Sequence, residues 1–190
     1  EPTKPDTTTQ QPQETQTTQQ QSTTEAAPTT ATTPTTEAAP SMAEAGTTLE
    51  VANADCKVRV TSASQEIPTV EYIAANNKKA SEIQIPDSVT VNGITYKVTS
   101  VAKNTFSGNK KVKKIVIGKN VTSIGKNAFA NCKNLKTIVV KTTKLTKKSI
   151  AKYVLKGTSK KLTIKVPKSK LMAYKKYFKG KGNKKVRVKK

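Results

Sequence analysis

The sequence predicts a β-rich solenoid of short stacked repeats, closed by a β-rich cap at its N-terminal end and a helical and strand cap at its C-terminal end. Three observations predict it. Residues 98–117 and 121–140 align without a gap at an offset of 23 residues, with ten identical positions. Each unit ends in two apolar residues separated by one residue. The segment before the repeats alternates apolar and polar residues, which is typical of strands.

Residues 1–48 differ in composition from the rest of the chain. They contain 17 threonines, seven glutamines and six prolines, and Met42 is their only large apolar residue. Such a segment buries too little apolar surface to offset the ~1–2 kcal/mol per residue that ordering a backbone costs. We therefore expect a disordered Thr/Pro/Gln-rich tether over residues 1–48 and one folded domain over residues 49–190.

The sequence predicts the N-terminal β cap over residues 49–97. Apolar and polar residues alternate over 56–61 and again over 70–74, which predicts two strands. A third strand is predicted over 82–85, where Pro86 ends it. Asn92 and Gly93 stand between two further alternating runs, and this pair favours the type I′ turn of a β-hairpin.

Residues 98–166 contain the repeats, and we expect the apolar pair at the end of each unit to form one rung of a stacked sheet. The pairs are Ile83/Ile85, Ile115/Ile117, Ile138/Val140, Ile164/Val166 and Val186/Val188. Successive rungs lie 32, 23, 26 and 22 residues apart, and the excess of nine in the first interval is about the length of the hairpin. Ile115, Ile138 and Ile164 should therefore share one dry core column.

The far side of this core and its C-terminal end are filled by other bulky residues. Phe106, Phe129 and Leu155 stand nine positions before three of the rungs, and Phe178 is the expected equivalent before the last one. Residues 167–190 predict the C-terminal cap. Apolar residues have helical spacing over 168–178, at Leu171, Met172, Tyr174 and Phe178, and a strand is predicted over 185–188.

Residues 121–140, VTSIGKNAFANCKNLKTIVV, resemble the BspA-like leucine-rich repeats of bacterial surface proteins, whose pattern is roughly V-T-x-I-G-x-x-A-F-x-x-C-x-x-L-x-x-I-x-I. The preceding unit departs from this pattern at Ala102, Thr105 and Asn109, where the family has Gly, Ala and Cys. The resemblance covers about residues 80–190, and residues 49–79 match only loosely. It implies a leucine-rich-repeat solenoid of short right-handed β/turn repeats.

The resemblance also implies a role. Proteins of this family are typically secreted or wall-attached and serve as adhesion or binding modules. The segment 164–178 is similar to the end of such arrays in Gram-positive gut bacteria. We therefore expect a partner outside the cell, namely a host or cell-wall protein or an anionic glycan such as teichoic acid. The alternatives are a basic structural domain that associates with the cell wall, and an accessory domain of a larger surface protein.

Cys56 and Cys132 are the two cysteines, 76 positions apart. A disulfide between them is possible, but sequence spacing does not decide it. Each residue also fits an apolar site as a small buried thiol. The family pattern has a cysteine at the position of Cys132, which favours the buried thiol there.

Residue types that carry chemistry are scarce. The chain has no histidine and no acidic residue after Asp87, so acid–base pairs and metal-ligand clusters cannot form in the repeats. It also lacks the glycine-rich loops that bind nucleotide phosphates. We therefore expect no catalytic residues, no metal and no cofactor. The chain also lacks the run of about 18 apolar residues that a membrane span requires.

The candidate ligand face follows from the alternation along the strands. If Ile115 and Ile117 point inward, Lys114 and Val116 point outward. Repeating this over the later rungs gives the candidate residues Lys114, Val116, Thr137, Val139, Thr163, Lys165, Lys185 and Arg187. These candidates form two outward rows, of which Lys185 ends the first and Arg187 ends the second. Val116 and Val139 are expected to form a small exposed apolar strip. The alternative is that valine merely suits a strand here.

Positive charge is concentrated in the repeats. Residues 88–190 contain 30 basic residues and no acidic one, within a chain of net charge +23. This excess fits either a well-solvated surface or adherence to polyanions. A nucleic acid partner is disfavoured, because Arg187 is the only arginine in that region and its phenylalanines are expected to be buried rather than free to stack on bases.

Overall fold

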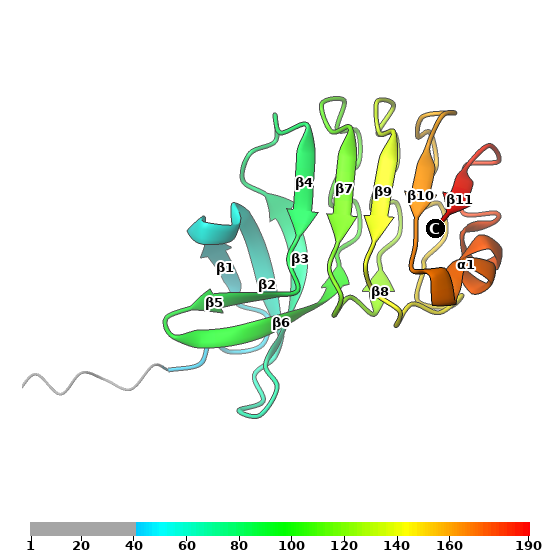
Figure 1. The fold of residues 1–190 in the computed structure, drawn as a ribbon. Coiled ribbons are helices and arrows are strands. Elements are labelled where there is room, and N and C mark those ends of the chain that lie inside the picture. The colour runs from blue at the N-terminus through cyan, green and yellow to red at the C-terminus, as the bar shows by residue number, and fades with distance from the viewer. Residues whose placement is uncertain (1–40) are drawn as a thin grey trace, which may run out of the picture. The chain divides into compact units, whose positions relative to one another are not determined.

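The computed structural model describes residues 41–190 (Figure 1). Most of the predicted tether, residues 1–40, lies outside the described residues. Met42 and Ala43 pack against the core, and the Ala43 amide donates a hydrogen bond of 3.1 Å to the Tyr96 hydroxyl. The Gly46 amide donates to the Val60 carbonyl at 2.8 Å. Contacts with the domain thus begin a few residues before Leu49, where the domain was predicted to start.

The N-terminal cap is a mostly antiparallel sheet, in the order β1-β2-β3-β6-β5. Its elements are β1 (Thr48–Val51), the 3₁₀ turn η1 (Ala52–Ala54), β2 (Cys56–Ser62), β3 (Thr69–Ala75), β5 (Ser88–Val91) and β6 (Ile94–Val101). The predicted hairpin is β5–β6, and Asn92 and Gly93 at its turn both have positive φ. The alternation in β2 buries Cys56, Val58 and Val60 on one face, so the strands predicted from it are confirmed.

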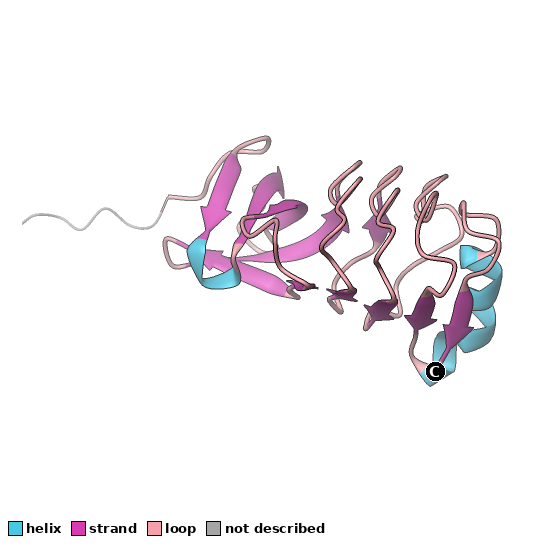
Figure 2. Cartoon of the chain, turned by 90° about the horizontal axis from the view of Figure 1, so that it is seen from above, coloured by secondary structure: helices cyan, strands magenta, loops and turns pink. Residues whose placement is uncertain are grey.

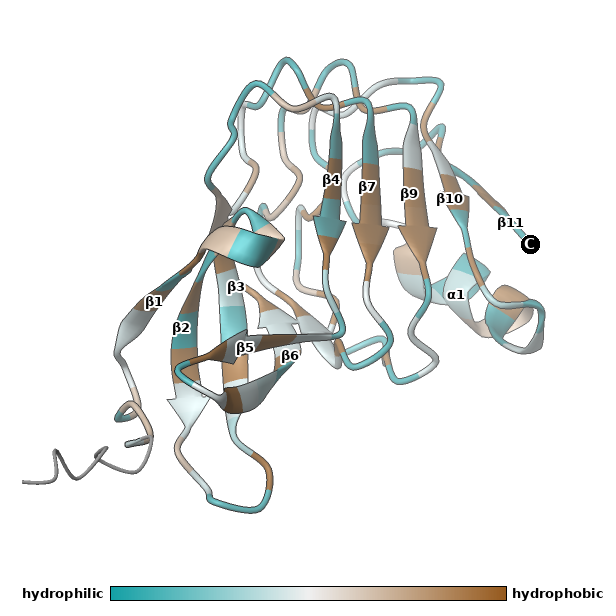
Figure 3. Cartoon of the chain, turned by 60° about the vertical axis from the view of Figure 1, so that its left-hand side comes forward, coloured by the Kyte–Doolittle hydropathy of each residue, from teal (hydrophilic) through white to brown (hydrophobic). Residues whose placement is uncertain are grey.

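The repeats form a second, wholly parallel sheet, in the order β11-β10-β9-β7-β4. Its strands are β4 (Glu82–Ile85), β7 (Lys114–Ile117), β9 (Thr137–Val140), β10 (Thr163–Lys165) and β11 (Arg187–Lys189). Seen from above in Figure 2, these strands lie along one side of the stacked turns. Figure 3 shows hydrophobic residues concentrated in β7 and β9, whereas the connecting loops are mostly hydrophilic.

One rung of this sheet contains Ile83, Ile115, Ile138, Ile164 and Val188 side by side. Ile115, Ile138 and Ile164 are fully buried, which confirms the predicted core column. The predicted register of the last rung was wrong by two residues, because Val188 and not Val186 lies beside Ile164. Both valines satisfy the alternation, and the strand follows a helix and loop whose length the repeat period does not fix.

The opposite wall of the solenoid is aromatic. The rings of Phe106 and Phe129 stack at 5.8 Å, and Tyr72 lies 5.7 Å from Phe106. Leu155 continues the column, as predicted, and is fully buried. The predicted place of Phe178 was wrong. The Phe178 ring is buried, but Phe178 does not occupy the position next to Leu155 in the column. The Leu155 amide donates to the Lys181 carbonyl at 2.8 Å, so the chain around residue 181 lies beside Leu155.

A short second ladder connects the cap to the repeats. β3 pairs in parallel with β6, and β6 pairs in parallel with β8 (Ser123–Ile124). Gly125 follows β8 at a point where two turns touch. A methyl group there would lie 2.6 Å from the main-chain nitrogen of Lys103 and 2.7 Å from the carbonyl carbon of Ala102. This close approach explains the glycine, because any side chain would push the turns apart.

The C-terminal cap consists of the 3₁₀ turn η2 (Lys168–Lys170) and the helix α1 (Leu171–Phe178). The Tyr174 hydroxyl donates to the Thr142 carbonyl at 2.9 Å and accepts from the Leu145 amide at 3.3 Å. These two buried bonds tie α1 to the loop after β9. Met172 was expected on the buried side of this helix, but its side chain is 70% exposed.

Both cysteines are buried free thiols, so the structure contains no disulfide between them. Cys132 Sγ donates to the Phe106 carbonyl at 2.9 Å, which links two successive turns. Burial raises the pKa of Cys132 to about 11. Burial, and to a lesser degree the charge of Asp55, raises the pKa of Cys56 to about 11. Both thiols therefore stay protonated at neutral pH.

Candidate functional site

The outer face of the parallel sheet carries two straight rows of side chains, fixed by the register of its strands. The first row is Glu82, Lys114, Thr137, Thr163 and Arg187. The second row is Gln84, Val116, Val139, Lys165 and Lys189. Because adjacent strands lie about 4.8 Å apart, successive members of a row can contact the same ligand.

Six of the eight candidate residues predicted from the sequence take their expected places in these rows. The two at the C-terminal end do not, because the last strand is shifted by two residues. Arg187 belongs to the first row rather than the second. Lys185 lies before β11, where its amide donates to Asn183 Oδ1 at 2.9 Å, and is not part of the sheet. Lys189, which the sequence reasoning missed, ends the second row.

The predicted exposed apolar strip was also wrong. Val116 is only 7% exposed, although it belongs to the outward row. β7 is a central strand, so side chains from β4 and β9 flank the short valine and shield it from solvent. Val139 is half-buried. The accessible part of the face is therefore polar, with Val139 as its apolar contribution.

Charge on this face changes from one end to the other. Lys114 Nζ lies 2.7 Å from a carboxylate oxygen of Glu82, so its charge is partly neutralised. Both side chains are exposed, and such a pair contributes little to stability. Lys165, Arg187 and Lys189 are exposed at the other end. No acid follows Asp87 in the chain, so these three cations have no acidic neighbour in sequence.

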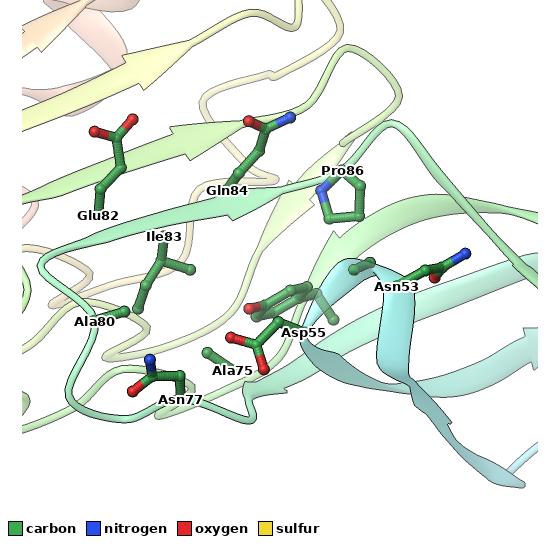
Figure 4. Close-up of a pocket in the computed structure, with 11 residues that line it drawn as sticks. Asn53, Asp55, Ala75, Asn77, Ala80, Glu82, Ile83, Gln84 and Pro86 are labelled. Atoms are coloured by element: carbon green, nitrogen blue, oxygen red, sulfur yellow. The ribbon is translucent and has the colours of Figure 1, made fainter.

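A hollow of about 410 Å³ lies between η1 and β4 (Figure 4). Its walls come from Asn53–Asp55 on one side and from Glu82–Gln84 on the other. A second hollow, of about 510 Å³, lies beside α1 and is lined by Lys175, Lys179 and Lys184 with Val186 and Val188. Sequence reasoning found neither: the first combines segments distant in the sequence, and the second depends on the path of the chain after α1. The acids at positions 55 and 82 were the available signal for the first hollow.

Within residues 41–190, no three histidine, cysteine or acidic side chains come together in a way that could hold a metal ion. In the same residues, no helix has the length and apolar character needed to cross a membrane.

The family model of the BspA type leucine-rich repeat region matches residues 56–185, in six copies. The chain belongs to this family. The match begins at Cys56, further towards the N-terminus than the resemblance predicted. The structure accounts for this, because β3 pairs in parallel with β6 and so continues the second ladder of the BspA-type solenoid.

Several solved structures are similar to this BspA-type chain, among them two described as leucine-rich proteins. A leucine-rich cell surface protein from Faecalibacterium prausnitzii is 20% identical over 66% of the chain, with a TM-score of 0.44. A leucine-rich repeat protein from Bacteroides capillosus is 18% identical over 75%, with a TM-score of 0.45. The pneumococcal vaccine antigen PcpA is 19% identical over 67%, with a TM-score of 0.48.

The chain spans 38% of the F. prausnitzii protein and 40% of PcpA, but 99% of the B. capillosus protein. No match is found among curated proteins.

Proposed function

We propose that this protein is a non-catalytic extracellular interaction module, which binds a host or cell-wall macromolecule through the outer face of its parallel sheet. The observation that carries the proposal is the unbroken parallel register from β4 to β11. Repeat folds present such extended surfaces to their partners, because every turn contributes side chains at the same place. Membership of the BspA-type family supports an interaction role.

The chemistry of the face indicates the kind of partner. Thr137 and Thr163 supply hydroxyl groups in the middle of the first row. Lys165 and Arg187 supply cations at the C-terminal end, and Val139 supplies apolar surface between them. A partner with carboxylate or sulfate groups and hydrogen-bonding donors would complement this arrangement.

We propose an extracellular location, with the protein secreted or attached to the cell wall. Membership of the BspA-type family supports it, because proteins of this family are typically secreted or wall-attached. The threonine- and proline-rich composition of the predicted tether also suits a spacer in a secreted protein.

A second candidate function is association with anionic cell-wall polymers such as teichoic acid. The observation that favours it is the charge of residues 88–190, which contain 30 basic residues and no acidic one. Binding of this kind needs no defined face, and salt weakens it strongly. In either function, the domain could be an accessory part of a larger surface protein.

Binding to arrays of host proteins, sulfated glycans and purified cell walls tests both functions at about 0.15 M salt, where exposed charges are screened beyond about 8 Å. Lys165→Glu reverses one charge on the proposed face. Lys97→Glu makes the same change on β6 of the other sheet, where Lys97 is also exposed, and is the matched control. Val139→Thr removes the apolar contribution while keeping a β-branched side chain.

If the face binds the partner, Lys165→Glu and Val139→Thr weaken binding and Lys97→Glu does not. If both lysine variants weaken binding equally and salt abolishes it, the wall-polymer function is correct. Absence of binding to every arrayed molecule and to cell walls would contradict both functions.

A further inference from the structure

β4 is an edge strand with unused hydrogen-bonding groups. It pairs with β7 on one side, and no strand of residues 41–190 pairs with its other side. The Lys114 amide donates to the Ser81 carbonyl at 3.0 Å, with Glu82 opposite Lys114 in the register. Because a parallel ladder uses alternate residues of each strand, the main-chain amides and carbonyls of Glu82 and Gln84 point away from β7. They point towards the hollow that both residues line.

The hollow has the position and size that one added strand requires. Its volume is about 410 Å³, and η1 forms the wall opposite β4 (Figure 4). Ile83 and Ala80 contribute apolar surface on the β4 side, and Ala75 at the end of β3 contributes more. A strand that pairs with Glu82–Ile85 needs about four extended residues, at about 3.3 Å per residue.

The hollow is also the acidic part of a basic protein. Asp55 and Glu82 line its two walls. Glu82 is paired with Lys114, whereas Asp55 forms no ion pair with any of the described residues. Asp55 is held in a left-handed conformation, with φ of 47°, at the end of η1. Its exposed carboxylate is therefore available to a cation from outside.

A buried tyrosine completes the lining. Tyr72 is 1% exposed and lines the hollow. Burial raises the pKa of Tyr72, and the neighbouring Cys56 and Asp55 raise it further, so the phenol stays protonated. Asn76, whose amide donates to the Asp55 carbonyl at 2.9 Å, has a buried side-chain oxygen that lacks a partner among the described residues. Buried polar atoms are normally satisfied, so this unpaired oxygen, between the lining residues Ala75 and Asn77, supports a ligand at the hollow.

We propose that this hollow binds an extended peptide segment of a partner protein by addition of a strand to β4, with a lysine or arginine of the segment on Asp55. Main-chain bonds to Glu82 and Gln84 provide affinity, and the carboxylate selects the basic side chain. The surrounding lysines repel cationic segments elsewhere on the repeats, which restricts such a segment to this end of the molecule.

Selection of a display library of random nine-residue peptides against the full chain tests the proposal. We expect enrichment of peptides with a lysine or arginine among β-branched residues. In the amide hydrogen-exchange spectrum, the strongest synthetic peptide should slow the exchange of the Glu82 and Gln84 amides. Cadaverine, a small diamine, should compete with this peptide weakly.

Two variants separate the main-chain and the charge contributions. Gln84→Pro removes an outward amide without touching the ladder to β7, and should weaken peptide binding at least about tenfold. Asp55→Asn keeps a residue type that tolerates the left-handed conformation, and should weaken it about tenfold. Glu50→Gln removes an acid on β1 outside the hollow and is the matched control, with no expected change.

The proposal is overturned if no peptide is enriched, or if Asp55→Asn binds the selected peptides as well as the wild type does. It is also overturned if peptides methylated at alternate backbone nitrogens bind normally, a result that does not depend on the folding of Gln84→Pro. Competition by cadaverine at the affinity of the peptide would indicate a small-cation site instead. Lys165→Glu should not affect peptide binding, so this proposal and the proposed function fail separately.

Discussion

The cap and the repeats achieve stability in different ways. The three ion pairs of residues 41–190 all use acids of the cap or of β4, namely Glu50, Glu71 and Glu82. The repeats after Asp87 contain no acid, and among the described residues Lys114 is the one lysine of the repeats with an ion pair, so burial and hydrogen bonds must offset the repulsion between the other lysines. The aromatic and isoleucine columns must therefore hold the repeats together, whereas the cap also has charge pairs across its strands.

In the repeats, the stacking of buried side chains must therefore stabilise a highly charged surface. Each turn of the repeats contributes one side chain to the isoleucine column and one to the opposite wall, and both are fully buried at Ile138 and Phe129. Contacts of this kind are between neighbouring turns, so damage to one turn affects the turns on both sides.

The largest expected effect is that of Phe129→Ala. Phe129 is fully buried and stacks on Phe106, so its loss leaves a cavity in the middle of the column. We expect a decrease of about 3–5 kcal/mol in the free energy of unfolding, measured by urea denaturation. Met172→Ala is the control at an exposed site, where a change within about 0.5 kcal/mol is expected. Equal effects of the two variants would mean that the column does not hold the repeats together.

Gly125→Ala should have the next largest effect. The added methyl group would lie 2.6 Å from the Lys103 nitrogen and force two turns apart, at a cost of about 2–3 kcal/mol. Gly108→Ala places its methyl group in open space at a φ of 78° and should cost only about 1 kcal/mol. Thermal unfolding of the two variants gives the comparison. A more harmful Gly108→Ala would show that backbone conformation matters more than the contact between turns.

Tyr174→Phe tests how α1 is attached to the last turns. It removes the bonds to Thr142 and Leu145 but keeps the ring, and should lower the free energy of unfolding by about 1–2 kcal/mol. Tyr177→Phe is the matched control on the same helix, because the Tyr177 hydroxyl has no hydrogen bond among the described residues. Chemical denaturation measures both, and an equal loss in both variants would argue against the role of the buried bonds.

Alkaline pH should destabilise both regions through their thiols. The pKa of Cys56 and of Cys132 rises from 9.0 to about 11 on folding, so the unfolded chain loses these protons at lower pH than the folded one. The contribution of the protonated thiols to the free energy of unfolding is fully present below pH 9.0 and is lost as the pH rises towards 11. Urea midpoints measured across this range should fall. An unchanged midpoint would indicate exposed thiols whose pKa does not change on folding, which a thiol reagent at neutral pH would also detect.

The smallest effect concerns the charge difference itself. Raising NaCl from about 0.02 M to about 0.3 M shortens the range of the repulsion between lysines and should raise the melting temperature slightly. Salt also weakens the exposed ion pairs of the cap, but these contribute little. A lower melting temperature in salt would mean that the ion pairs of the cap outweigh the repulsion in the repeats.

The sequence predicted the features that depend on local pattern. The constant offset between the two aligned units placed Ile115 and Ile138 on one rung, and Asn92–Gly93 located the hairpin. Features that depend on loop geometry were not predicted. Val186 and Val188 both fit the alternation, so only the path of the chain after α1 decides which one pairs with Ile164.

The candidate face was predicted only in part, because the alternation along a strand gives the direction of a side chain but not its exposure. Alternation correctly assigned outward rows to Lys114, Thr137 and Lys165. It could not show that neighbouring strands shield Val116, because exposure depends on side chains of β4 and β9, which are distant from Val116 in the sequence. The hollow beside β4 needs η1, β3 and β4 together, and no periodic signal connects these segments.

The interval between β4 and β7 has a practical consequence. It contains the β5–β6 hairpin, yet Ile83 pairs with Ile115 in the same register as Ile115 with Ile138. The chain leaves the stack after Pro86 and returns along β6, whose second half pairs with β3 and β8, so the turn at Asn92–Gly93 is the corner of the hairpin that lies outside this ladder. For protein engineering, this corner is a natural position at which to lengthen the hairpin or graft a foreign epitope.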